Sequence, residues 1–136
     1  MTFTQPKTAI LGTGLSLIAL CCTALIPASA MAGEKATTPA TQFEVTRTTD
    51  GVVKAGVKAF HKGDYAKSVA LNKTAIRNGM SKRKRAVAQS NLCASWAMLD
   101  NLAQAEKACK AALELRPDYG PARANIDLLT IKLAQK

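Results

Sequence analysis

Apolar residues recur at spacings of three and four along residues 86–117, the pattern of two amphipathic helices joined by a short turn. In the first half, Leu92, Trp96 and Leu99 share one helix face. In the second half, the residues on the equivalent face are Leu102, Ala105, Cys109, Ala112 and Leu113. The polar pair Asp100-Asn101 interrupts the pattern, and a side-chain oxygen there can cap the second helix. The stretch is therefore predicted to form a helical hairpin.

Residues 50–80 show the same organisation in a looser form. Asp50 is expected to cap a helix that carries Val52, Val53, Val57 and Phe60 on one face. Gly63 ends that helix, because glycine tolerates a left-handed backbone, and Asp64 caps the next one. The core side of this second helix is expected to comprise Tyr65, Ser68, Val69, Asn72, Ala75 and Ile76. These features predict a second hairpin.

The chain closes with a further predicted helix over residues 118–136. Pro121 falls in its first turn, where the missing N–H costs nothing. At about 100° per residue, one face gathers Ala122, Ile126, Leu129 and Leu133 and is expected to pack on the preceding hairpin. Leu128 and Ile131 point the other way, so we expect them to contribute to an oligomer or partner contact. Ordinary scattered exposure of apolar residues is the alternative.

The two hairpins resemble the tetratricopeptide repeat, a helix-turn-helix unit of about 34 residues. The residues that carry the resemblance are Asn91, Leu92, Trp96, Leu102, Ala105, Ala112, Leu113 and Pro117, together with the Gly63-Asp64-Tyr65 turn. The earlier copy departs from the family at Ser68 and Asn72 and has no closing proline near Met80. The resemblance implies an all-α domain over residues 50–136, built as antiparallel helix-turn-helix repeats in an α-α superhelix, with about two repeats and a C-terminal capping helix. An antiparallel helical bundle with an alanine-rich seam is the alternative.

Residues 1–32 have the order of features of a cleavable signal peptide. Lys7 precedes an apolar run, and small residues offer cleavage after Ala30 or Ala32. A membrane anchor is the alternative, while Cys21 and Cys22 lack the small preceding residue of a lipoprotein signal. Residues 33–49 are rich in Thr, Ala and Pro and are predicted to be a flexible linker. We therefore expect an exported protein, periplasmic in a bacterium, without a transmembrane anchor in the mature chain; a secreted or membrane-associated protein is the alternative.

Removal of the signal peptide leaves two cysteines, Cys93 and Cys109, one on each helix of the central hairpin. An even number in an oxidising compartment favours a disulfide between them. A pair of small buried thiols is the alternative. Two cysteines without a clustered histidine do not complete a zinc site, so no metal is expected.

No catalytic constellation is present in the sequence, so we expect neither an enzyme nor a cofactor. The only histidine, His61, lies at a predicted helix end beside Lys62, a solvated setting. The tetratricopeptide resemblance implies instead that a protein or peptide segment binds along the inner surface formed by the first helix of each repeat. The matching inner positions are Val53, Val57, Ser90, Asn91, Ala94, Ala97 and Asn125. Asn91 and Asn125 can hold backbone amides of a partner, since an amide side chain both donates and accepts; internal packing is the alternative for both.

The chain has a formal net charge of +10, of which the signal peptide removes only Lys7, so anionic partners are favoured. Four successive basic residues are predicted at a helix start, where the helix dipole disfavours them; they are Lys82, Arg83, Lys84 and Arg85. This placement suggests a binding role, with a solvated surface as the alternative. The leading hypothesis is a non-catalytic protein-interaction adaptor of the periplasm or cell envelope. Its rivals are a binder of anionic polymers, lipids or nucleic acid and a structural subunit of an envelope complex, and homodimerisation is a further expectation.

Overall fold

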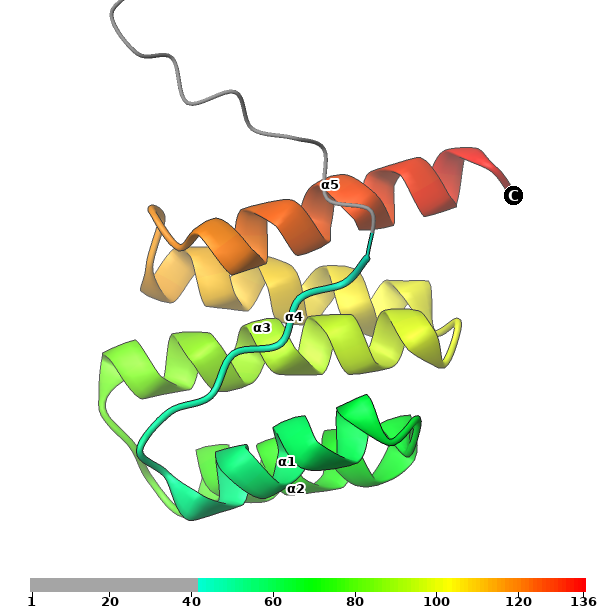
Figure 1. The fold of residues 1–136 in the computed structure, drawn as a ribbon. Coiled ribbons are helices and arrows are strands. Elements are labelled where there is room, and N and C mark those ends of the chain that lie inside the picture. The colour runs from blue at the N-terminus through cyan, green and yellow to red at the C-terminus, as the bar shows by residue number, and fades with distance from the viewer. Residues whose placement is uncertain (1–41) are drawn as a thin grey trace, which may run out of the picture. The chain divides into compact units, whose positions relative to one another are not determined.

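The computed structural model describes residues 42–136, in which five α-helices follow one another (Figure 1). They are α1 (Gly51–His61), α2 (Tyr65–Arg77), α3 (Lys82–Met98), α4 (Leu102–Leu115) and α5 (Gly120–Ala134). The predicted signal peptide and the first part of the predicted linker lie outside the described residues. No helix within residues 42–136 is both long enough and apolar enough to cross a membrane.

Helix ends follow the capping residues that the sequence indicates. The Asp50 side chain accepts from the N–H groups of Val52 and Val53, and Asn101 caps α4 by accepting from the N–H of Gln104. Asp64 caps α2 in the same way. Ser81 lies at the N-cap position of α3, but its side chain makes no capping hydrogen bond.

The helices pack as two antiparallel hairpins, α1 with α2 and α3 with α4, and α5 lies against the second hairpin (Figure 1). The all-α prediction of two helical hairpins and a closing helix is therefore confirmed. The main core joins α2, α3, α4 and α5 through Val69, Leu92, Cys93, Ala97, Leu102, Ala105, Ala108, Cys109 and Leu129. Alanine and cysteine make up most of this core, and their small side chains let the helix backbones approach closely.

Two predicted core residues are not in the core. Leu99 is 41 % exposed and Leu133 is 45 % exposed. Leu99 is the C-cap of α3, where the chain turns away from the packed face, and Leu133 lies in the last turn of α5, beyond Leu129. Helical periodicity assigns a residue to a face but does not show where the neighbouring helix ends.

A polar contact joins the two hairpins between α2 and α3. The hydroxyls of Ser68 and Ser95 share a hydrogen bond of 2.8 Å, and Ser95 also donates to the carbonyl of Asn91. The Asn72 amide donates to the carbonyl of Ser68 at 2.9 Å. Ser68, Asn72 and Ser95 are fully buried. The Ser68 hydroxyl and the Asn72 amide nitrogen are hydrogen-bonded, whereas Asn72 Oδ1 is buried without a hydrogen-bond partner within the described residues.

Helices α1 and α2 are in close contact where Gly56 faces Asn72. A Cβ atom on Gly56 would lie 2.7 Å from Asn72 Nδ2, whereas one on Gly51, in the same helix, would meet nothing within 4 Å. A side chain at position 56 would therefore force the Asn72 amide to shift, although the backbone of Gly56 is helical and does not itself need glycine.

We expect Gly56→Ala to lower the free energy of unfolding by about 1 kcal/mol, because the overpacking cost exceeds the gain in helix propensity. Gly51→Ala is the matched control and should be neutral or slightly stabilising in urea denaturation. In an Asn72→Ala background the same Gly56→Ala change should become stabilising. A Gly56→Ala protein at least as stable as the wild type would contradict this account of the contact.

The sulfur atoms of Cys93 and Cys109 lie at bonding distance, 2.09 Å, and join α3 to α4 as the sequence predicts. Both residues are fully buried within the main core. The bridge closes a loop with a sequence separation of 16. For a loop of about this length, the chain-entropy model gives roughly 3 kcal/mol of stabilisation.

We expect reduction of this disulfide to lower the melting temperature by about 10 °C or more, since about 1 kcal/mol moves a small domain by 4 to 8 °C. Thermal melts followed by circular dichroism, with and without a phosphine reductant, measure the effect. A Cys93→Ala/Cys109→Ala protein should melt at the same temperature in both conditions. Two reactive thiols in the unreduced, denatured mature protein, which lacks Cys21 and Cys22, would show that no bridge forms.

Candidate functional site

Residues 42–49 form an extended segment that crosses the domain before entering α1. Figure 1 shows this segment, in cyan, running from the edge of α5 across α3 to the start of α1. The helices beneath it are the first helix of the second hairpin and the closing helix, the positions that the repeat resemblance assigns to an inner surface. We call the surface of α3 and α5 that this segment covers, around Asn91 and Asn125, the groove.

Two buried asparagines hold the segment by its backbone. Asn125 Oδ1 accepts from the N–H of Glu44 at 2.7 Å, and Asn125 Nδ2 donates to the Glu44 carbonyl at 2.9 Å. Asn91 does the same with Thr46, at 2.8 Å and 2.9 Å. Each amide therefore satisfies both backbone groups of one residue, as a neighbouring β-strand would.

From residue 42 to residue 45 the side chains alternate between exposed and half-buried, as in an extended chain. Glu44 is exposed, whereas Phe43 packs against the main core and Val45 is half-buried. Affinity in such an arrangement comes from main-chain hydrogen bonds and selectivity from the alternate side chains. The groove thus has the chemistry of a site for extended polypeptide.

The expectation that residues 33–49 are wholly a flexible linker needs correction for residues 42–49. The sequence offers no second strand to pair with Phe43–Thr46, and the structure has none within residues 42–136. The partner of the extended segment is instead the pair of asparagine side chains on α3 and α5. An isolated amide leaves no period-two pattern in the sequence, so pattern analysis could not identify it.

Tyr119 is 6 % exposed and packs with Val87, Ala112 and Ala122. Burial raises the pKa of its hydroxyl, while the neighbouring Thr46 and Arg116 offset part of the rise. The hydroxyl itself makes no hydrogen bond within the described residues, and the Arg116 guanidinium lies 4.6 Å from the ring centre. Sequence analysis missed Tyr119, because it immediately precedes α5 and belongs to no helical stripe.

The other predicted inner-surface residues are buried. Val53 packs with Ala75 and Ala88 of the following helices, and Val57 is 1 % exposed, so neither offers a surface to a partner. Ser90 accepts from Asn125 Nδ2 through its carbonyl, at 3.4 Å, and its hydroxyl, at 3.3 Å. Ala94 and Ala97 are fully covered. Of the predicted set, Asn91 and Asn125 are the two whose side chains contact the bound segment.

The basic residues 82–85 occupy the first turn of α3, as expected. Lys84 is half-buried and the other three are exposed, and none forms an ion pair within residues 42–136. On α5, Leu128 is half-buried and Ile131 is 51 % exposed. None of these residues takes part in the groove hydrogen bonds, and their roles in anion binding and in a partner contact stay predictions.

No protein-family model, curated protein or solved structure matches this chain. The resemblance to the tetratricopeptide repeat therefore rests on the matching sequence positions and on the observed succession of hairpins. Within residues 42–136, no group of three or more His, Cys, Asp or Glu side chains is placed to hold a metal ion. The hydrogen bonds from Asn91 and Asn125 to an extended backbone are the chemical feature of the groove.

We expect Tyr119 to ionise above the ordinary tyrosine value of about 10, because burial disfavours the phenolate. An ultraviolet absorbance titration of a Tyr65→Phe protein reports Tyr119 alone, since the chain has two tyrosines. Because the folded-state pKa is raised, the stability contributed by neutral Tyr119 is complete below pH about 10 and is lost as the pH rises through the folded-state pKa.

Loosening the segment should expose Tyr119 and move its ionisation midpoint down towards the ordinary value. Glu44→Pro/Thr46→Pro removes the two N–H groups that donate hydrogen bonds to Asn125 and Asn91. Glu44→Ala/Thr46→Ala is the matched control, because it removes the same two side chains, which themselves shift the pKa of Tyr119, but keeps both N–H groups. Equal midpoints in the proline variant and in this control would mean that the segment does not cover Tyr119 in solution.

Proposed function

We propose that this protein is a non-catalytic binding module that holds an extended polypeptide segment in the groove by its backbone. The observation that supports the proposal is the pair of buried amides, Asn91 and Asn125, each hydrogen-bonded to both backbone groups of one residue. The two residues held, Thr46 and Glu44, are two positions apart, which is the repeat of an extended chain. Any segment that adopts the same conformation presents the same groups to the two amides.

Selectivity in this proposal comes from the side chains between and beside the held residues. Phe43 is partly buried and packs against the main core. An aromatic or large aliphatic ligand residue is therefore favoured directly before the residue that Asn125 holds. Glu44 and Arg47 point to solvent and carry little selectivity. A ligand of the form apolar-x-β-branched, in an extended conformation, fits these requirements.

The chain's own segment competes with such a ligand. A tethered segment acts at an effective concentration in the millimolar range, so a partner must bind more tightly or meet the segment when it is released. The apparent affinity for a partner is reduced by the fraction of molecules whose groove is open. The proposed module is therefore autoinhibited by residues 42–49.

The proposed setting is the cell envelope. Residues 1–32 support export, and the Cys93–Cys109 bridge suits an oxidising compartment such as the bacterial periplasm. The hairpin succession supports membership of the tetratricopeptide repeat family, whose inner surfaces bind partner segments. An adaptor or scaffold that meets its partner in the periplasm agrees with these features.

A peptide added in trans tests the proposal. A fluorescent peptide of residues 42–49 should bind the Glu44→Pro/Thr46→Pro protein and should bind the wild type at least about tenfold more weakly, because the wild-type groove is occupied. Fluorescence polarisation measures both affinities. Asn91→Ala or Asn125→Ala in the open background should also weaken binding by about tenfold, with thermal melts confirming the fold.

The matched control peptide carries proline at the positions of Glu44 and Thr46. It keeps the apolar side chains but lacks the two N–H groups, so it should bind at least about tenfold more weakly. Equal binding of the two peptides would contradict backbone recognition. Equal binding of the first peptide to the open variant and to the wild type would place it outside the groove.

A further inference from the structure

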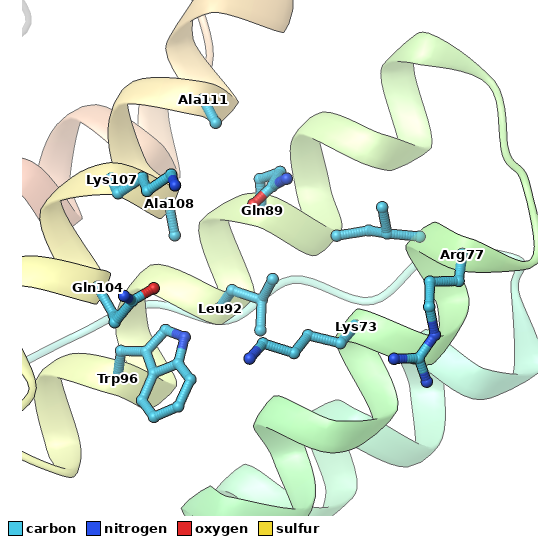
Figure 2. Close-up of a pocket in the computed structure, with 10 residues that line it drawn as sticks. Lys73, Arg77, Gln89, Leu92, Trp96, Gln104, Lys107, Ala108 and Ala111 are labelled. Atoms are coloured by element: carbon cyan, nitrogen blue, oxygen red, sulfur yellow. The ribbon is translucent and has the colours of Figure 1, made fainter.

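A second concave site lies on another face of the domain, between α2, α3 and α4 (Figure 2). This site, the Trp96 hollow, has a volume of about 360 Å³ and is lined by Lys73, Ile76, Arg77, Gln89, Leu92, Trp96, Gln104, Lys107, Ala108 and Ala111. Leu92 follows Asn91 in α3, so the two side chains point about 100° apart around that helix. The hollow and the groove are therefore separate sites, and ligand binding in the hollow is independent of the proposed function.

The floor of the hollow is apolar. Leu92 and Ala108 belong to the main core, and Trp96 packs against it while remaining half-buried. Figure 2 shows Leu92 and Trp96 on α3 between the residues of α2 and those of α4. The disulfide joins the residues that directly follow Leu92 and Ala108, which fixes α3 and α4 relative to one another at the floor. This part of the hollow is preformed, as small-molecule sites usually are.

The rim of the hollow is cationic. Lys73 and Arg77 come from α2 and Lys107 from α4, and no Asp or Glu lines the hollow. None of the three cations forms an ion pair within residues 42–136. Lys73 Nζ lies 4.8 Å from the centre of the Trp96 ring, which places a positive charge directly over the apolar floor. Gln89 and Gln104 add amide groups that can donate hydrogen bonds.

Two other surface hollows in the described residues lack this combination. One, on α4, includes Glu106 and Glu114, and its Lys110 is paired with Glu106. The other, at the start of α3, contains Asp118 beside its basic residues and has no aromatic side chain. An aromatic floor under unpaired cations therefore distinguishes the Trp96 hollow from these two.

We propose that the Trp96 hollow binds a small amphiphilic anion: a carboxylate on a compact apolar body. The cationic rim with Lys73 and Lys107 takes the carboxylate, with the glutamine amides as further donors, and the apolar body lies on the floor formed by Leu92, Ala108 and Trp96. The volume is at the lower end of the range for small-molecule sites, about 300 to 1,000 Å³, which suits a single short chain or ring. A medium-chain fatty acid has this chemistry.

Titration of the full mature protein with sodium octanoate tests the proposal. Trp96 is the chain's one tryptophan, so its fluorescence reports the hollow directly. We expect a saturable change with one site per molecule. Octan-1-ol keeps the apolar body without the charge and should bind at least about tenfold more weakly, and acetate, which keeps the charge alone, should give no saturable change.

Charge-matched variants distinguish binding in the hollow from a general attraction of anions to this basic protein. Lys73→Gln/Lys107→Gln should weaken octanoate binding by about tenfold or more. Lys58→Gln/Lys67→Gln removes the same charge from exposed positions outside the hollow and should leave the affinity unchanged. Calorimetric titration repeats each measurement without relying on Trp96, whose fluorescence Lys73 itself influences.

A third variant, Ala111→Phe, fills the hollow without changing charge, and it should also weaken octanoate binding by about tenfold while leaving the thermal melt cooperative. Octanol binding as tight as octanoate binding would overturn the anionic character of the site. Equal losses in the two double-lysine variants, or no saturable octanoate signal in the wild type by either method, would overturn the site itself.

Discussion

The structure depends on the satisfaction of every polar side chain that α3 buries. This helix is covered by α2, α4, α5 and the extended segment, and ten of its residues are buried. Three of them are polar: Ser95 bonds to Ser68, Asn91 to Thr46, and Ser90 to Asn125. An unpaired polar group at these positions would cost about 1 to 3 kcal/mol each. The partners of α3 are thus fixed by hydrogen bonding as well as by shape.

The extended segment, which lies outside the helical array, supplies hydrogen-bond partners to the buried amides of Asn91 and Asn125. Without residues 42–49, the amides of Asn91 and Asn125 would need water or another chain to replace the backbone groups of Thr46 and Glu44. Phe43 adds apolar cover to the same face. A surface that is used for binding in the proposed function therefore also contributes to the stability of the free protein, and the two roles use the same hydrogen bonds.

Helix positions and caps could be predicted from the sequence because they are local properties. Asp50, Asp64 and Asn101 all cap the helices that the periodicity indicates, and the cysteine pair follows from helix faces within one hairpin. Contacts between distant parts of the chain were not accessible in this way. The pairing of Glu44 with Asn125 spans 81 residues and leaves no local signal. The Trp96 hollow was missed for the same reason, since its cations come from two helices whose separation only the fold determines.

Occupation of the groove by a covalently attached segment limits how fast a partner can bind. If a partner can enter only after residues 42–49 have left, its association rate stops rising with concentration once it reaches the rate at which the segment detaches. That detachment breaks the four hydrogen bonds of two asparagines and the packing of Phe43. The fastest response of such a protein to its partner would be set by the lifetime of its own closed state, and not by how abundant the partner is.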